Sequence, residues 1–220
     1  MALWDLSSRN AQGKMKMATP YLAAFDPSAS VIAIASQSTS SILLFDARNY
    51  DKSPFSTFDL TPYEDVYTPS PRDRAWTRLE FSNDGKHVLL GTDFNGHFVL
   101  DAFDGRMKAF LVGRVGSSSR ASPMSNLSNG NGKPQGQGDV CFSQDGRFVV
   151  GSSGDKAEAI VWDLQQTPDS SSFLQPIARL PSRGRAAIIE CNPRYNMLAT
   201  ADKDVIFWRP EENPKSVEEK

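Results

Sequence analysis

The sequence predicts an all-β fold made of repeated four-stranded units, and three features support this prediction. Helical periodicity is almost absent. Short apolar runs, each followed by residues that favour tight turns, recur along the chain. Each of them is followed at a nearly constant distance by a member of a second series. In that second series, apolar segments end in an aromatic or aliphatic residue followed by aspartate, as in MALWDL, SILLFDA, HFVLDAF and AIVWDL, with a degenerate copy in DVIFWRP.

The spacing of the two series indicates one repeating unit with insertions. The aspartate-containing pairs lie 41, 55 and 62 residues apart. The runs AAFDPSAS, LEFSNDGK, VCFSQDGR and IECNPRYN contain the Asp-Pro and Asp-Gly contexts of hairpin turns. From Phe25, Phe81 and Phe142 to the next pair, the distances are 20, 19 and 20 residues. The pairs are Trp4-Asp5, Phe45-Asp46, Leu100-Asp101 and Trp162-Asp163.

Each unit contains four expected strands. The first precedes the turn, the second is VIAIAS, HVLLGT, FVVGSS or MLATAD, the third ends at the pair, and the fourth is PFSTFDL, RMKAFLV or FLQPIARL. Four strands in about forty residues, closed by a Trp-Asp-type pair, are typical of a WD40 β-propeller blade. We therefore predict a partial WD40 β-propeller, with about three full blades and two partial blades of an expected seven. The aspartates are expected to fix the blades structurally.

The blades are expected over residues 1–210, followed by a flexible tail at 211–220. Two insertions interrupt them. Residues 61–75 are polar and rich in proline, and residues 115–138 have the Gly/Ser/Asn composition of a disordered loop. The segment QTPDSSSFLQP at 166–176 is also expanded.

The sequence begins and ends within expected blades, which leaves two interpretations. The chain is a fragment of a longer propeller, or it is a complete small propeller whose ends pair to close the ring. An unclosed arc would leave unpaired strand edges, which favour aggregation.

Composition excludes several classes of protein. The chain has 220 residues, 39% of them hydrophobic, which is enough for a sizeable core. With 24 basic and 26 acidic residues its net charge is -2, so direct nucleic-acid binding is not expected. No segment has the roughly 20 apolar residues of a membrane helix, and the start lacks the pattern of a targeting peptide. Two cysteines without a Cys-x-x-Cys pair fit a reducing compartment, the cytoplasm or the nucleus.

No catalytic, cofactor-binding or metal-binding motif is found, so the chain is expected to be a non-enzyme without cofactors. His87 and His97 lie in strand contexts with no cysteine or carboxylate at ligand spacing. Cys141 and Cys191 lie in apolar first strands, where thiols of the core are expected. A self-contained propeller enzyme would need a convergent acid-base or metal constellation that two histidines in these positions do not offer.

Several segments resemble one family of WD-repeat proteins. They are ALWDLSSRNAQGKMKMATPYLAAFDPSASVIAIAS, FDARNYDKSPFSTF, WTRLEFSNDGKHVLLGT, DAFDGRMKAF and ECNPRYNMLATADKDVIFWRP. The family is the WD-repeat subunit shared by the Set1-type (COMPASS) histone H3 lysine-4 methyltransferase and, in fungi, the cleavage and polyadenylation factor. Its animal counterpart is WD repeat-containing protein eighty-two. The two expanded segments suggest a fungal-type member, and the family's seven blades imply that this chain is truncated at its N-terminus.

The resemblance implies a nuclear, non-catalytic scaffold. Its implied partners are the methyltransferase catalytic subunit, other COMPASS subunits, phosphorylated C-terminal repeats of RNA polymerase II, and cleavage and polyadenylation factor subunits in mRNA 3′-end processing. The alternatives are a generic WD40 peptide-binding module, or a truncated chain with no independent function.

One rim of the propeller is the candidate partner-binding surface. In a WD blade, the connection between the second and third strands lies on the same rim as the connection to the next blade. Arginine forks on such a rim suit phosphate recognition, whereas the alternative is an ordinary solvated surface. The candidate residues are Arg72, Arg74, Arg114, Arg120, Arg183, Arg185, Tyr63 and Tyr67.

Overall fold

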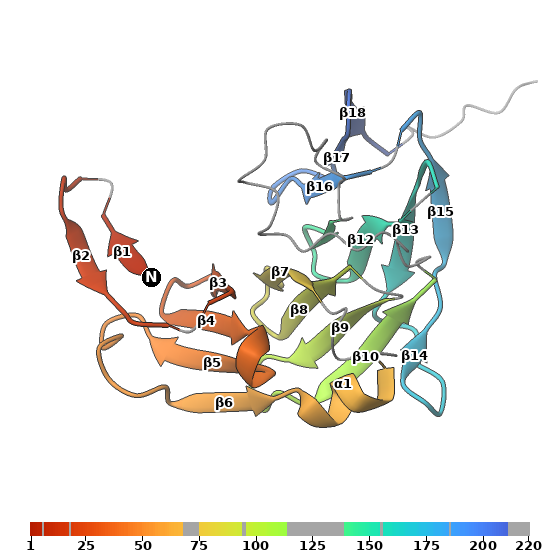
Figure 1. Cartoon of the computed structure of the whole chain (residues 1–220). Helices are drawn as coiled ribbons and strands as arrows, with labels where there is room; N and C mark the ends of the chain where they lie inside the picture. The colour runs from red at the N-terminus through yellow and green to blue at the C-terminus, as the bar shows by residue number, and fades with distance from the viewer. Residues whose placement is uncertain are drawn as a thin grey trace, which may run out of the picture.

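The computed structural model describes residues 1–5, 7–17, 19–67, 75–93, 96–113, 139–154, 156–184 and 186–210. In these ranges the chain is almost entirely β, with one short α-helix and one 3-10 turn, η1 (Gln37–Thr39). The strands form five sheets that follow one another as an open arc (Figure 1). The predicted all-β fold is confirmed, and the successive antiparallel sheets are those expected of propeller blades.

Three central sheets are full blades in which consecutive strands pair antiparallel. Blade 1 contains β3 (Tyr21–Phe25), β4 (Val31–Ser36), β5 (Ser41–Asp46) and β6 (Ser56–Asp59). Blade 2 contains β7 (Trp76–Phe81), β8 (His87–Thr92), β9 (Gly96–Asp101) and β10 (Met107–Val112). Blade 3 contains β11 (Val140–Phe142), β12 (Phe148–Ser152), β13 (Glu158–Asp163) and β15 (Ala178–Pro181).

The two terminal sheets each hold part of a blade. The N-terminal sheet pairs β1 (Ala2–Trp4) with β2 (Ala11–Lys14), which take the places of a third and a fourth strand. The C-terminal sheet contains first, second and third strands, namely β16 (Ile188–Cys191), β17 (Leu198–Ala201) and β18 (Val205–Trp208).

Tight turns join the first and second strands where the sequence predicts them. Gly85 in blade 2 and Gly146 in blade 3 have φ of +71° and +69°, a conformation that glycine adopts without strain. In the blade 2 turn, the hydroxyl of Ser82 donates to Asp84 at 2.6 Å. Ala29 holds the same position in blade 1 with φ of +56°, which strains a residue with a Cβ.

The second strand of each full blade is buried on both faces, which explains its continuous apolar sequence. In β8, Val88 and Leu90 pack in the core between blades 1 and 2, whereas Leu89 packs in the core between blades 2 and 3. Successive side chains of a strand point to opposite faces, so an inter-blade core on each side needs apolar residues at every position. Two further cores join the N-terminal sheet to blade 1 and the C-terminal sheet to blade 3.

The segment FLQPIARL does not form one fourth strand, and that prediction is wrong. Its second half gives β15 of blade 3, but its first half gives β14 (Phe173–Leu174), which pairs parallel with β10 of blade 2. Leu174 is 1% exposed in the core between blades 2 and 3. Two interactions therefore hold the first half of this segment on blade 2: the burial of Leu174, and the hydrogen bond from the Phe110 amide to the Ser172 carbonyl.

The first insertion begins with helix α1 (Thr61–Tyr67), which the sequence pattern does not predict. Pro62 is compatible with the first turn of a helix, and the Thr61 amide donates to the Asp59 carboxylate at 2.9 Å. The buried Glu64 accepts a hydrogen bond from Trp76 Nε1 at 3.1 Å. Such a short helix needs tertiary contacts of this kind. Residues 68–74, the insertion at 115–138 and the tail at 211–220 lie outside the described residues.

Helix α1 is the one α-helix of the described ranges, and it has neither the length nor the apolar character that a bilayer crossing requires.

Candidate partner-binding surfaces

The WD-type aspartates organise the turns that follow the third strands. Asp46, Asp101 and Asp163 are the last residues of β5, β9 and β13, and Asp5 follows β1 directly. Each carboxylate accepts a hydrogen bond from the backbone amide two residues later. This local geometry fixes the exit from the strand, so these side chains are engaged within the blade.

Asp163 has an additional partner in the preceding hairpin turn. Arg147 donates to it through Nε at 3.0 Å and through Nη2 at 2.6 Å. The guanidinium of Arg147 holds the pKa of Asp163 below its usual value. The same guanidinium lies 4.7 Å from the ring centre of Phe148. The pair ties the second strand of blade 3 to its third.

The connections between second and third strands meet the connections between blades. In blade 2, the Asp93 carboxylate accepts a hydrogen bond from the Ala75 amide at 3.1 Å, and the Asp93 amide donates to the Ala75 carbonyl. Ala75 enters blade 2, whereas Asp93 follows its second strand. Loops of these two kinds therefore share one rim.

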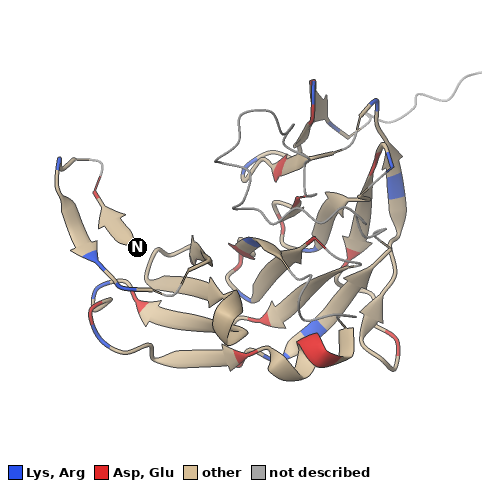
Figure 2. Cartoon of the chain, viewed as in Figure 1, with Lys and Arg blue, Asp and Glu red and all other residues tan. Residues whose placement is uncertain are grey.

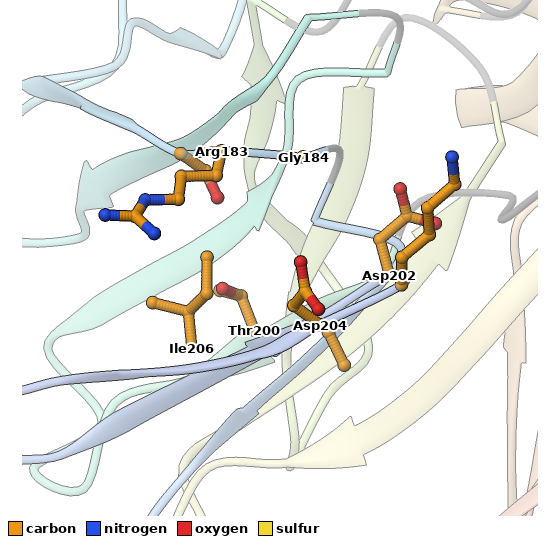
Figure 3. A pocket seen from close by; sticks show the side chains of 9 residues that line it. Arg183, Gly184, Thr200, Asp202, Asp204 and Ile206 are labelled. Carbon is orange, nitrogen blue, oxygen red and sulfur yellow. The ribbon is translucent and has the colours of Figure 1, made fainter.

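A pocket of about 150 Å³ lies on this rim between blade 3 and the C-terminal sheet (Figure 3). The connection that leaves blade 3 contributes Arg183, and the β17–β18 turn contributes Asp202, Lys203 and Asp204. Two cationic and two anionic side chains therefore line the same pocket, which gives it a mixed charge.

Only one of the six candidate arginines falls within the described residues. Arg183 is exposed and lines this pocket. The other five lie outside the described residues: Arg72, Arg74, Arg114, Arg120 and Arg185.

The two candidate tyrosines pack against blade 2 and are not among the residues that line the pocket. Tyr67 stacks on Phe110 with ring centres 4.9 Å apart, and its hydroxyl donates to the Ser171 carbonyl at 2.6 Å. The Tyr63 hydroxyl accepts a hydrogen bond from the Met107 amide at 3.3 Å. Both side chains hold α1 on blade 2, and Tyr67 also holds the β14 segment there.

A charged cluster on the first strands is not visible in the sequence pattern. The first strands are in contact from sheet to sheet: β7 contacts β11, and β11 contacts β16. Arg78 of β7 contacts Glu80 at 3.1 Å, Asp139 at 3.2 Å and Glu190 at 2.5 Å. One guanidinium therefore joins carboxylates from blade 2, blade 3 and the C-terminal sheet.

Burial raises the pKa of Glu80 to about 7, although Arg78 acts in the opposite direction. The sequence separations within this cluster, 61 residues from Arg78 to Asp139 and 112 to Glu190, explain why no local motif reveals it.

The histidines and cysteines lie in the strands where they were expected. His97 in β9 accepts a hydrogen bond from the Thr92 amide at 3.1 Å and meets Trp162 edge to face. His87 begins β8, and burial lowers its pKa. Cys141 and Cys191 are free thiols in β11 and β16. Within the described ranges, no group of three or more potential metal ligands occurs.

Comparison with known proteins gives relatives over almost the whole chain, although no protein-family model matches it. An uncharacterised WD-repeat-containing protein of Schizosaccharomyces pombe is 35% identical over 96% of the chain and 60% of its own length. COMPASS component SWD2 of Saccharomyces cerevisiae is 30% identical over 94% of the chain and 57% of its own length. Set1 complex component swd2 of Schizosaccharomyces pombe is 28% identical over 94% of the chain and 61% of its own length.

The chain is homologous to Swd2-like WD-repeat proteins. The resemblance drawn from the sequence is thereby confirmed, and it extends over the blades described above. The chain spans about 60% of the length of these curated relatives. Charged residues of both signs are scattered over the blades of the chain (Figure 2).

Proposed function

We propose that this protein is a non-catalytic scaffold subunit of a COMPASS-type histone H3 lysine-4 methyltransferase complex in the nucleus. The observation that carries the proposal is similarity over 94% of the chain to two proteins that are named as COMPASS and Set1 complex components. In this role the propeller supplies binding energy, and the catalytic subunit supplies the chemistry.

The construction of the blades suits such a scaffold. Each full blade shares an apolar core with the sheet on either side, so its rim loops are carried by a rigid framework. Rigid loops lose little conformational entropy when a partner binds, which favours affinity. The described charged groups of the blades mainly bond with one another or cap turns, as Arg78 and Asp163 do.

We also propose that the rim around Arg183 and Arg185 contacts an anionic segment of a partner, with the phosphorylated repeats of RNA polymerase II as the partner class. Arg183 and Lys203 supply positive charge in the pocket. Asp202 and Asp204 oppose it, so phosphate binding there depends on the arginine forks. Arg72, Arg74, Arg114 and Arg120 are further candidates on the same rim, whereas Tyr63 and Tyr67 are engaged in packing.

Binding of a phosphoserine repeat peptide tests the rim proposal. The double substitution Arg183→Ala, Arg185→Ala should weaken binding of the phosphorylated peptide by about tenfold or more, because charge-assisted bonds are lost. The matched variant Asp204→Asn should strengthen it. Equal affinity of the double variant and the unchanged protein would remove these arginines from the partner-binding surface.

A second candidate is a subunit of the mRNA cleavage and polyadenylation factor. Two of the relatives are proteins of Schizosaccharomyces pombe, and the chain is 35% identical to the uncharacterised one but 28% identical to the one named as a Set1 complex component. The higher identity to a relative whose name mentions no Set1 complex is the observation behind this second candidate, and the family resemblance supplies 3′-end processing as the alternative assembly.

Affinity purification from nuclear extract, followed by quantitative mass spectrometry, separates the two candidates. The leading proposal predicts that the tagged full-length protein copurifies the methyltransferase catalytic subunit in near-equal amounts. Recovery of 3′-end processing subunits without the methyltransferase would replace it with the second candidate. Recovery of neither assembly would contradict both.

A further inference from the structure

The two cysteines of the chain meet at the junction of blade 3 and the C-terminal sheet. Cys141 lies in the middle of β11, and Cys191 is the last residue of β16, 50 residues later. Their sulfur atoms are 3.5 Å apart, and the Cys141 thiol donates a hydrogen bond to Cys191 Sγ. The two first strands are in contact, so the thiols face each other across the gap between two sheets.

The surroundings of the two sulfur atoms differ. Cys141 is 1% exposed and packs with Val150, Ala159 and Ile189 in the core of this junction, whereas Cys191 is only half-buried at its margin. Glu80, Glu190 and Arg78 of the charged cluster on the first strands act electrostatically on the Cys191 sulfur. A small oxidant therefore reaches Cys191 more readily than Cys141.

We propose that Cys141 and Cys191 form a redox-sensitive dithiol that closes to a disulfide when the protein meets a peroxide. Nothing in the sequence pattern suggests this site, because the two residues are distant along the chain and belong to different blades. A disulfide requires the sulfur atoms to approach from 3.5 Å to about 2.05 Å, a movement within the reach of side-chain rotation.

The reaction proceeds in two steps with hydrogen peroxide as the two-electron oxidant. The Cys191 thiolate attacks one peroxide oxygen, the O–O bond breaks, and Cys191 sulfenic acid and hydroxide form. The Cys141 sulfur then attacks the Cys191 sulfur, and the S–O bond breaks. The leaving hydroxide takes the Cys141 proton and departs as water. Two thiols and one peroxide thus give one disulfide and two waters.

The order of the two thiols follows from their hydrogen bond. Cys191 accepts this bond, which lowers its pKa, whereas donation of the bond and burial raise the pKa of Cys141. The half-buried acceptor is therefore the attacking thiolate, and the buried donor is the resolving thiol.

The disulfide would join the C-terminal sheet covalently to blade 3. That sheet is the less buried side of the junction, with Ile188, Val205 and Phe207 each more than half exposed. Their shared core is small and includes Ala186, Ile189 and Leu198. A covalent link closing a loop of this length restricts the unfolded chain and secures the sheet to its neighbour.

Mass spectrometry of the peroxide-treated full chain tests the site. The intact mass should fall by about 2 Da, and N-ethylmaleimide added in denaturant should label neither cysteine, since both thiols are consumed. Digestion should give one peptide pair linked through Cys141 and Cys191. The melting temperature should rise by roughly 10 °C and return to its starting value when dithiothreitol is added.

Two single variants test the order of the steps. In Cys141→Ser, dimedone should trap a sulfenic acid on Cys191, whereas in Cys191→Ser the buried Cys141 should keep its thiol under the same treatment. The untreated and treated wild-type chains remain decisive if a variant fails to fold. Two free thiols after treatment of the folded chain, or disulfides between separate chains alone, would overturn the proposal.

Discussion

At the scale of single residues, the turn between the first and second strands has a residue with positive φ in all three full blades, but the residue type differs. Gly85 and Gly146 adopt positive φ without a steric cost, whereas Ala29 adopts φ of +56° in the equivalent place. The repeated turn imposes this conformation, because the adjoining strands β3 and β4 are in full antiparallel register. The first turn of blade 1 is therefore strained, whereas the equivalent turns of blades 2 and 3 are not.

Substitution at this position should change stability in opposite directions in the two blades. Ala29→Gly removes backbone strain of about 1–2 kcal/mol but increases the conformational entropy of the unfolded chain. The net effect should be a rise of about 0.5–1 kcal/mol in the free energy of unfolding. Gly85→Ala should cost about 1 kcal/mol because alanine is strained at φ of +71°, whereas the added Cβ itself meets no clash, its nearest neighbour being Pro27 at 3.9 Å. Urea unfolding measures both. A destabilised Ala29→Gly variant would contradict this account of the turn.

Glu80 should make the stability of the chain depend on pH. The pKa of its carboxyl is 4.5 in the unfolded chain and about 7 in the folded chain, because burial disfavours the charged form. The folded chain therefore binds more protons between these values. The stabilisation is complete below about pH 4.5 and is lost as the pH rises through 7.

The variant Glu80→Gln should lose this dependence while keeping an acceptor for Arg78. Between pH 5 and pH 8, the free energy of unfolding of the wild-type chain should fall by about 2 kcal/mol more than that of the variant. Urea unfolding at the two pH values provides the measurement. His87 is common to both proteins, so its own titration cancels in the comparison. Identical pH profiles would show that Glu80 is not buried in this way.

At the scale of elements, the β14 segment connects two blades that are also joined by their core. It leaves blade 3 between β13 and β15, pairs with β10 of blade 2, and accepts a hydrogen bond from Tyr67 at the Ser171 carbonyl. Tyr67 also lies edge to face with Phe173, with ring centres 5.3 Å apart. Helix α1 and β14 therefore stabilise each other's position on blade 2.

Truncation of the buried residue of β14 should weaken this junction. Leu174→Ala removes a side chain that is 1% exposed and should lower the free energy of unfolding by about 3 kcal/mol. The neighbouring exposed Gln175 gives the matched control, and Gln175→Ala should change stability by less than about 0.5 kcal/mol. Chemical denaturation of the two variants measures the difference. Equal effects would mean that β14 does not pack on blade 2.

Elements defined by local patterns were predictable, whereas elements defined by distant partners were not. The turn at Asp84-Gly85 and the apolar run that follows it predict strand β8, and both are local signals. Helix α1 depends on Trp76, and the Tyr67 hydroxyl finds its acceptor 104 residues away. No periodicity within seven residues can encode such contacts, so the sequence showed only a polar, proline-rich insertion.

In the candidate sites, too, features set by local patterns were predictable, whereas features set by residues distant in the sequence were not. The place of Arg183 in the loop that leaves blade 3 follows from the strand pattern, whereas its role in partner binding stays a prediction. The mixed charge of its pocket could not be predicted, since Asp202 and Asp204 come from the next sheet. Likewise, the sequence placed Cys141 and Cys191 in equivalent strands but did not show that their sulfur atoms meet.

At the scale of the whole molecule, the described sheets form one continuous series of shared cores. Each full blade buries apolar side chains against both neighbours, and Arg78 links blade 2, blade 3 and the C-terminal sheet through carboxylates. Sheets coupled in this way hold their loops in fixed relative positions. That property is what a scaffold needs in order to hold several partners at once.

Reconstitution tests the central claim, membership of a COMPASS-type complex as a non-catalytic subunit, most directly. The full-length protein is mixed with a methyltransferase complex that lacks its Swd2-like subunit, and the mass of the assembly is measured by light scattering after size exclusion. The account predicts an increase equal to one copy of the protein at micromolar concentration. An assembly whose mass stays unchanged, with the added protein eluting separately, would contradict it.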